Sequence, residues 1–157
     1  MNDTLDSTII HERREAALSS AMRVEQLADS LSQAATSLHG AVMRAIRKRA
    51  GQGENGISQT QAQAVFALEV ALRQQANQLY ADAAGHTVAG LDAAQRQLSG
   101  LLDAVRLSIA RNDNVRHWII LATSLLNLGN AVIARNPERI LASVDKVRER
   151  LQTAPHD

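Results

Sequence analysis

The stretch "VEQLADSLSQAATSLHGAV", residues Val24 to Val42, determines the fold class of this 157-residue chain. Apolar residues recur along it every seven positions, each followed four residues later by a second one: Val24 and Ala28, Leu31 and Ala35, Leu38 and Val42. The seven-residue spacing continues back to Ile10 and Ala17. A repeat of this kind is typical of an amphipathic α-helix that buries a narrow apolar stripe. The sequence therefore predicts one long helix from about Ser7 to Arg49.

The composition favours an all-α protein. Apolar residues make up 45% of the chain, enough for one core, but aromatic residues make up only 2%, whereas strands are enriched in aromatic and β-branched residues. The 17 basic and 16 acidic residues nearly cancel, so net charge does not draw the chain toward nucleic acid or an anionic membrane. We expect a single elongated up-and-down helical bundle over residues 1–157, with frayed ends at about 1–6 and 153–157.

Capping patterns divide the rest of the chain into further helices. "SQTQ", residues 58–61, has the spacing of a capping box and predicts a helix start. A polar turn precedes a predicted helix over 115–135, and "NPER" predicts an asparagine cap with a first-turn proline for a last helix over 137–152. The apolar pattern over 58–111 is compatible with one continuous helix or with a break at Gly85. The bundle therefore has between three long helices, one of them kinked, and five.

The residues present disfavour catalysis. The chain has no cysteine, which removes disulfides, thiolate metal sites and a cysteine nucleophile. No H-x-x-x-H or E-x-x-H spacing and no phosphate-binding glycine loop occurs, so we expect no enzyme activity, no metal and no cofactor. The first residues carry acids before any base and no apolar run, which argues against a secretory signal and favours a cytoplasmic protein.

An uncharged run from Trp118 to Ala134 is the most informative candidate site. It is shorter than the roughly 20 apolar residues of a membrane span and is interrupted by polar residues, so it predicts a buried central helix and no membrane span. Buried asparagines need hydrogen-bond partners, and at helix interfaces they often fix register or oligomeric state. We therefore predict a partner-facing or self-association surface at Trp118, Asn127, Gly129 and Asn130.

The run "HTVAG", residues 86–90, offers a first alternative. It resembles the motif of histidine phosphotransfer domains, in which an exposed histidine on a helical bundle is followed by lysine and glycine. His86, Thr87 and Gly90 match the motif, while Ala89 replaces the lysine that would stabilise the phosphoryl charge. The resemblance covers five residues and implies that His86 is a phosphoacceptor exposed on a helix. A helix kink with a surface histidine explains the same residues.

The run "RAIRKR" offers a second alternative. Arg44, Arg47, Lys48 and Arg49 are candidates for a nucleic-acid-binding patch, but no aromatic residue lies nearby for base stacking, and bases at a helix end also complement the helix dipole. The mild basic excess after Arg135 is typical of a solvated face. We expect a non-enzymatic protein–protein interaction or regulatory scaffold domain that binds another protein or itself, with a homodimer as the expected state and nucleic acid disfavoured as a partner.

Overall fold

The computed structural model describes the backbone of residues 2–52, 57–88 and 92–153 and the side chains of residues 21–48, 57–88 and 97–153. Its elements are all helical: α1 (Asn2–Gln52), α2 (Gln59–Ala81), a short 3-10 turn η2 (Ala84–His86), α3 (Asp92–Arg111), α4 (Val115–Ile133) and α5 (Pro137–Gln152). No strand occurs in these ranges. The predicted all-α bundle is confirmed, in its five-helix form.

The apolar pattern over residues 58–111 was compatible with one continuous helix or with a break at Gly85, and the structure shows a break. α2 ends at Ala81, and the Asp82 carboxylate accepts a hydrogen bond from the Gly85 backbone N–H at 3.1 Å. A Cβ at Gly85 would overlap that carboxylate, so a larger residue there would have to displace the Asp82 side chain and break this bond. The turn is also held by Arg135, just after α4, whose guanidinium donates to the Gly85 carbonyl at 3.0 Å.

The predicted helix starts are confirmed at their caps. The Ser58 hydroxyl accepts from the Gln61 N–H, and the Gln61 side chain accepts from the Ser58 N–H, each at 3.1 Å. Asn114 caps α4, and Asn136 caps α5 by accepting from the Arg139 N–H at 3.2 Å. These bonds satisfy backbone donors that a helix start leaves free.

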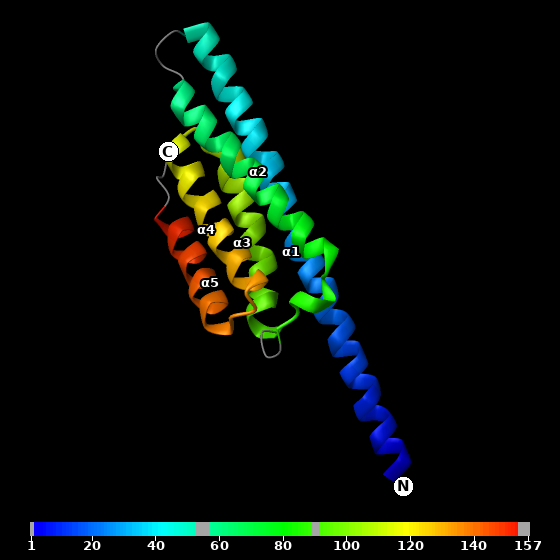
Figure 1. Cartoon of the computed structure of the whole chain (residues 1–157). Helices are drawn as coiled ribbons and strands as arrows, with labels where there is room; N and C mark the ends of the chain where they lie inside the picture. The colour runs from blue at the N-terminus through cyan, green and yellow to red at the C-terminus, as the bar shows by residue number, and fades with distance from the viewer. Residues whose placement is uncertain (1, 53–56, 89–91, 154–157) are drawn as a thin grey trace.

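The helices pack as an elongated bundle with α1 along its whole length (Figure 1). α1 contacts α2 and α3, α4 contacts α2 and α5, and α5 contacts α3. The buried core is almost entirely aliphatic, and the stripe predicted on α1 lies in it: Val24, Ala28, Leu31, Ala35, Leu38 and Val42. The seven-residue pattern was therefore a correct guide to the buried face.

α1 is longer than predicted and extends past the other helices. It begins at Asn2 rather than at Ser7 and contains 51 residues, which at 1.5 Å per residue corresponds to roughly 76 Å. α2, with 23 residues, reaches only about 35 Å. Figure 1 shows the N-terminal part of α1 standing clear of the bundle, on the side away from α4 and α5.

Candidate interaction surfaces

The four residues predicted as a partner surface do not lie on one exposed face. Trp118 and Gly129 are buried, whereas Asn127 and Asn130 are exposed. The expectation of two buried amides in α4 is therefore wrong. Both asparagines fall on the polar side of an otherwise apolar helix, and the run from Trp118 to Ala134 is uncharged because α4 packs against both α2 and α5.

Trp118 belongs to the core. Its exposed fraction is 1%, and its indole N–H donates to the Asn112 carbonyl at 2.6 Å. That bond ties the turn between α3 and α4 to the core, and it satisfies the one polar atom that burial of a tryptophan side chain would otherwise leave unpaired. Trp118 is thus inaccessible to a partner in the folded chain.

Gln75 of α2 is the buried polar residue that sequence reasoning missed. Its side chain is 7% exposed, and its amide N–H₂ donates to the Leu126 carbonyl and to Asn130 Oδ1, each at 2.8 Å. Its Oε1 has no partner in the described structure. Gln75 lies three residues after Leu72, on the apolar face of α2. A polar residue at such a position was the signal in the sequence that could have indicated a buried amide.

His86 does not lie on an exposed helix, as the phosphotransfer resemblance requires. It belongs to η2, the turn between α2 and α3, and is half-buried. Its Nδ1 is buried without a hydrogen-bond partner in the described structure. Gly90 and Ala89, the other positions of that motif, lie outside the described residues.

The basic residues near the end of α1 do not form one free basic face. Arg44 donates to the Ala110 carbonyl at 3.2 Å, and Lys48 pairs with Asp113 at 2.8 Å. Arg47 is exposed, and the Arg49 side chain lies outside the described ones. Two of these cations thus connect α1 to the end of α3 and the turn that follows it, which is a structural role that also explains their position.

A shallow groove between α4 and α5, here called the α4/α5 groove, contains two hollows. One, of about 210 Å³, is lined by Asn114, Arg116, His117, Ile120, Arg150 and Thr153. The other, of about 300 Å³, is lined by Ser124, Asn127, Arg139, Ala142, Ser143 and Lys146. Because these two contacting helices are joined by a short turn, the hollows follow one another along the same interhelical line.

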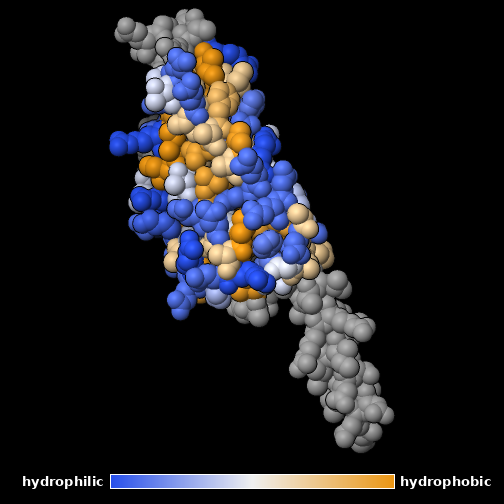
Figure 2. All heavy atoms as spheres, in the orientation of Figure 1, coloured by the Kyte–Doolittle hydropathy of each residue, from blue (hydrophilic) through white to orange (hydrophobic). Residues whose placement is uncertain are grey.

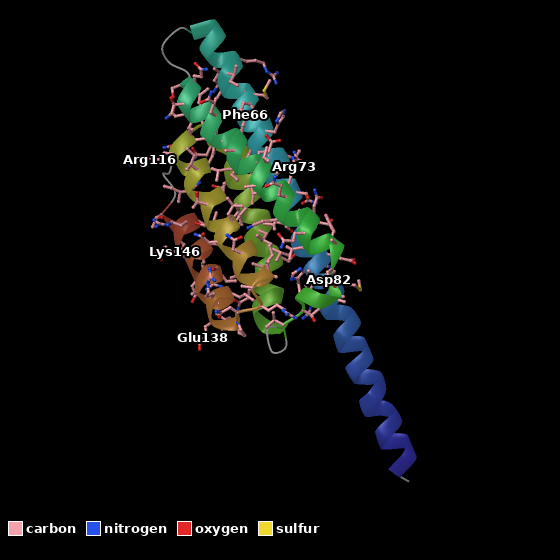
Figure 3. The ribbon with its side chains drawn as sticks, viewed as in Figure 1. Phe66, Arg73, Asp82, Arg116, Glu138 and Lys146 are labelled. Atoms are coloured by element: carbon pink, nitrogen blue, oxygen red, sulfur yellow. The ribbon has the colours of Figure 1, made fainter. Side chains whose placement is uncertain are left out.

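The α4/α5 groove is rich in unpaired positive charge. Figure 3 labels Arg116 of α4 and Lys146 of α5 on this side of the bundle. Within the described part of the chain, the guanidinium groups of Arg116, Arg139 and Arg150 have no hydrogen-bond or ion-pair partner. Among the described acids, Lys146 approaches Glu149, at 3.9 Å and exposed, a geometry that contributes little stability.

His117 forms part of the groove wall, but it is 4% exposed. Its Nε2 lies 2.7 Å from the Ser108 hydroxyl of α3. Burial lowers the pKa of His117 below its ordinary value, because the imidazolium form would lose its hydration. The positive charge of the groove therefore comes from arginine and lysine, and His117 remains neutral at pH 7.

A second surface is apolar. Figure 2 shows apolar atoms gathered over the first halves of α2 and α4. On these helices Val70 is 54% exposed and Ile120 is 36% exposed, and Phe66, Ile119 and Leu126 are half-buried. Exposed apolar patches of this kind are commonly interaction surfaces.

Neither metal nor membrane features appear in the described structure. No group of three or more His, Asp or Glu side chains in the described ranges is placed to hold a metal ion, and none of the described helices is long and apolar enough to cross a membrane. Comparison with protein-family models, with curated proteins and with solved structures found no match for this chain. The protein is accordingly described by its fold, an all-α bundle with one projecting helix.

Proposed function

We propose that this protein is a non-enzymatic interaction or scaffold protein that associates with a second copy of itself through the projecting part of α1. The observation that carries the proposal is the position of that segment. Near the lower end of the bundle, Tyr80 of α2 bonds to Asp29 of α1, and Leu98 of α3 lines a small hollow with Leu27 of α1. Residues 2–20 of α1 extend beyond these contacts (Figure 1).

A helix that stands clear of its bundle lacks the packing that normally stabilises helices. Most helical stability in proteins comes from packing of an amphipathic face against neighbouring elements. The seven-residue pattern buried at Val24 and Leu31 continues in the sequence at Ile10 and Ala17. The apolar residues of the projecting segment have no helix of their own bundle to pack against, and a second chain can supply one.

Interaction is favoured over catalysis by the distribution of reactive side chains. The described histidines lie apart: His39 on α1 beside Glu69, His86 in η2, and His117 at the start of α4. General acid–base and nucleophilic chemistry needs such groups within hydrogen-bond reach of one another and of a shared substrate position.

The test is the solution mass of the full chain by light scattering over a range of concentrations. We expect twice the 17.0 kDa chain mass. Ile10→Lys, which places a charge in the apolar pattern, should shift the protein toward monomer, while Thr8→Lys, two residues away on the opposite side of the helix, should leave the mass unchanged. A wild-type monomer at every concentration, or equal behaviour of the two variants, would contradict the proposal.

A further inference from the structure

We propose that the α4/α5 groove is the docking site for the acidic beginning of α1 from a second copy of the chain. This inference rests on the self-association proposed above and specifies both of its surfaces. It is carried by the charge of the groove, by the apolar side chain within it, and by the composition and direction of the projecting segment.

α5 separates its charges into two faces. One face of α5 carries polar and basic residues at helical spacing: Arg139, Ser143, Lys146 and Arg150. The first three line the hollow of about 300 Å³, and Arg150 lines the hollow of about 210 Å³. The three acids of α5, Glu138, Asp145 and Glu149, are all exposed and recur at the same spacing on the neighbouring solvent-facing side. Three cations of α5 therefore line the groove, and no acid lines either hollow. On the neighbouring side, Glu149 approaches Lys146 at 3.9 Å, and Asp145 pairs with the remaining cation, Arg148.

α4 adds a cation and an apolar contact to the groove without adding any acid. No Asp or Glu occurs between Val115 and Ile133. Arg116 lies in the first turn, and Ile120, one turn later, is 36% exposed and lines the same hollow as Arg116 and Arg150. An occupant that offers carboxylates together with aliphatic side chains satisfies both features.

The first residues of α1 have this composition. Residues 2–10, "NDTLDSTII", contain two acids, Asp3 and Asp6, three aliphatic residues, Leu5, Ile9 and Ile10, and no base. They form the first turns of α1, so a helical segment with acids, aliphatic residues and no base is available on every copy. Charge complementarity of this kind selects partners and orients them as they meet.

The occupant comes from a second copy because the same chain cannot supply it. α1 is a continuous helix from Asn2 to Gln52, and its N-terminal part points away from α4 and α5 (Figure 1). A continuous helix does not fold back on its own bundle. The exposed Ile120 also favours an occupant with aliphatic side chains over a nucleic-acid backbone, which is contacted mainly by charged and polar groups.

The experiment exchanges the charges of the two surfaces in the full chain. The groove variant carries Arg139→Glu and Lys146→Glu, and the helix variant carries Asp3→Lys and Asp6→Lys. We expect each alone to dimerise about tenfold or more weakly, because like charges then face each other. An equimolar mixture should regain the wild-type dimer, since each groove then meets a helix of opposite charge. Arg47→Glu with Arg111→Glu is the control, with the same charge change on exposed residues outside the groove.

The possible results bear differently on groove docking and on self-association. A groove variant that dimerises like the control overturns groove docking and leaves self-association standing. Weak dimers in both variants without recovery in the mixture overturn the pairing of these two surfaces. A wild-type monomer overturns both proposals. If the groove variant loses affinity for a DNA duplex and keeps its dimer affinity, the groove is a phosphate-binding site and the inference is wrong. Circular dichroism of every variant confirms that the bundle is folded.

Discussion

Gly129 of α4 lies directly against the side chain of Gln75 of α2. A Cβ at position 129 would overlap the Gln75 amide, so glycine allows α4 to approach α2 closely enough for Gln75 to bond to the Leu126 carbonyl and to Asn130. This contact fixes the register of two helices whose interface is otherwise mostly aliphatic, because a shift by one turn would leave a buried amide without its partners.

Gly129→Ala should destabilise the fold by about 1–3 kcal/mol, since a methyl group is forced into a filled, buried position. Gly100→Ala is the matched control, because an added Cβ there meets no atom within 4 Å, and replacing an exposed helical glycine by alanine stabilises by about 0.5–1 kcal/mol. Urea unfolding of both variants measures the difference. Two variants of equal stability would show that Gln75 moves aside at no cost.

Substitutions at Gln75 show whether stability depends on its amide hydrogen-bond donor or on the volume of its side chain. Gln75→Leu should change stability by less than about 1.5 kcal/mol, because it also removes a buried oxygen that has no partner. Gln75→Glu should cost about 3 kcal/mol or more at pH 7, since a buried carboxylate would face two acceptor oxygens. Acidification should restore part of that loss as the carboxyl protonates and donates. Urea unfolding at pH 7 and pH 5 tests both variants.

The buried His117 predicts a pH dependence of stability. Burial lowers its pKa in the folded state, so the unfolded chain binds the proton more readily. The contribution of His117 is complete above the unfolded pKa of about 6.5 and is lost as pH falls toward the folded pKa, by at most about 1.4 kcal/mol per pH unit. Unfolding of wild type and His117→Gln between pH 8 and pH 5 isolates this histidine, because the other four are common to both chains. Parallel curves would contradict the prediction.

Trp118 is the only tryptophan of the chain, which makes its burial measurable by fluorescence. We expect blue-shifted emission and almost no quenching by iodide in the folded protein, at concentrations above and below that of dimer formation. Trp118→Phe should cost about 1–3 kcal/mol, because the Asn112 carbonyl loses its donor and the smaller ring leaves space. Quenching that depends on protein concentration would instead place Trp118 at an interface.

Local signals in the sequence predicted most of the fold. The seven-residue pattern identified the buried face of α1, and the caps at Ser58, Asn114 and Asn136 marked the helix starts, because capping depends on residues within one turn. The choice between a continuous and a broken helix at Gly85 was only partly local. The Asp82 carboxylate lies within one turn of Gly85, but Arg135, which follows α4 with a positive φ of 53°, donates to the Gly85 carbonyl from 50 residues further along the chain.

The α4/α5 groove could likewise be predicted from the sequence only in part. Arg139, Ser143, Lys146 and Arg150 can be read from the sequence as one face of a helix, but only the packing of α5 against α4 shows that this face lines a groove. The residue pattern alone was enough to predict an all-α chain with a long apolar stripe on α1, because helical periodicity and capping are properties of neighbouring residues. The exposure of Asn127, the burial of Trp118 and Gln75, and the extension of α1 beyond the other helices could be seen only in the packed bundle. Each of these features depends on which helices meet across the fold.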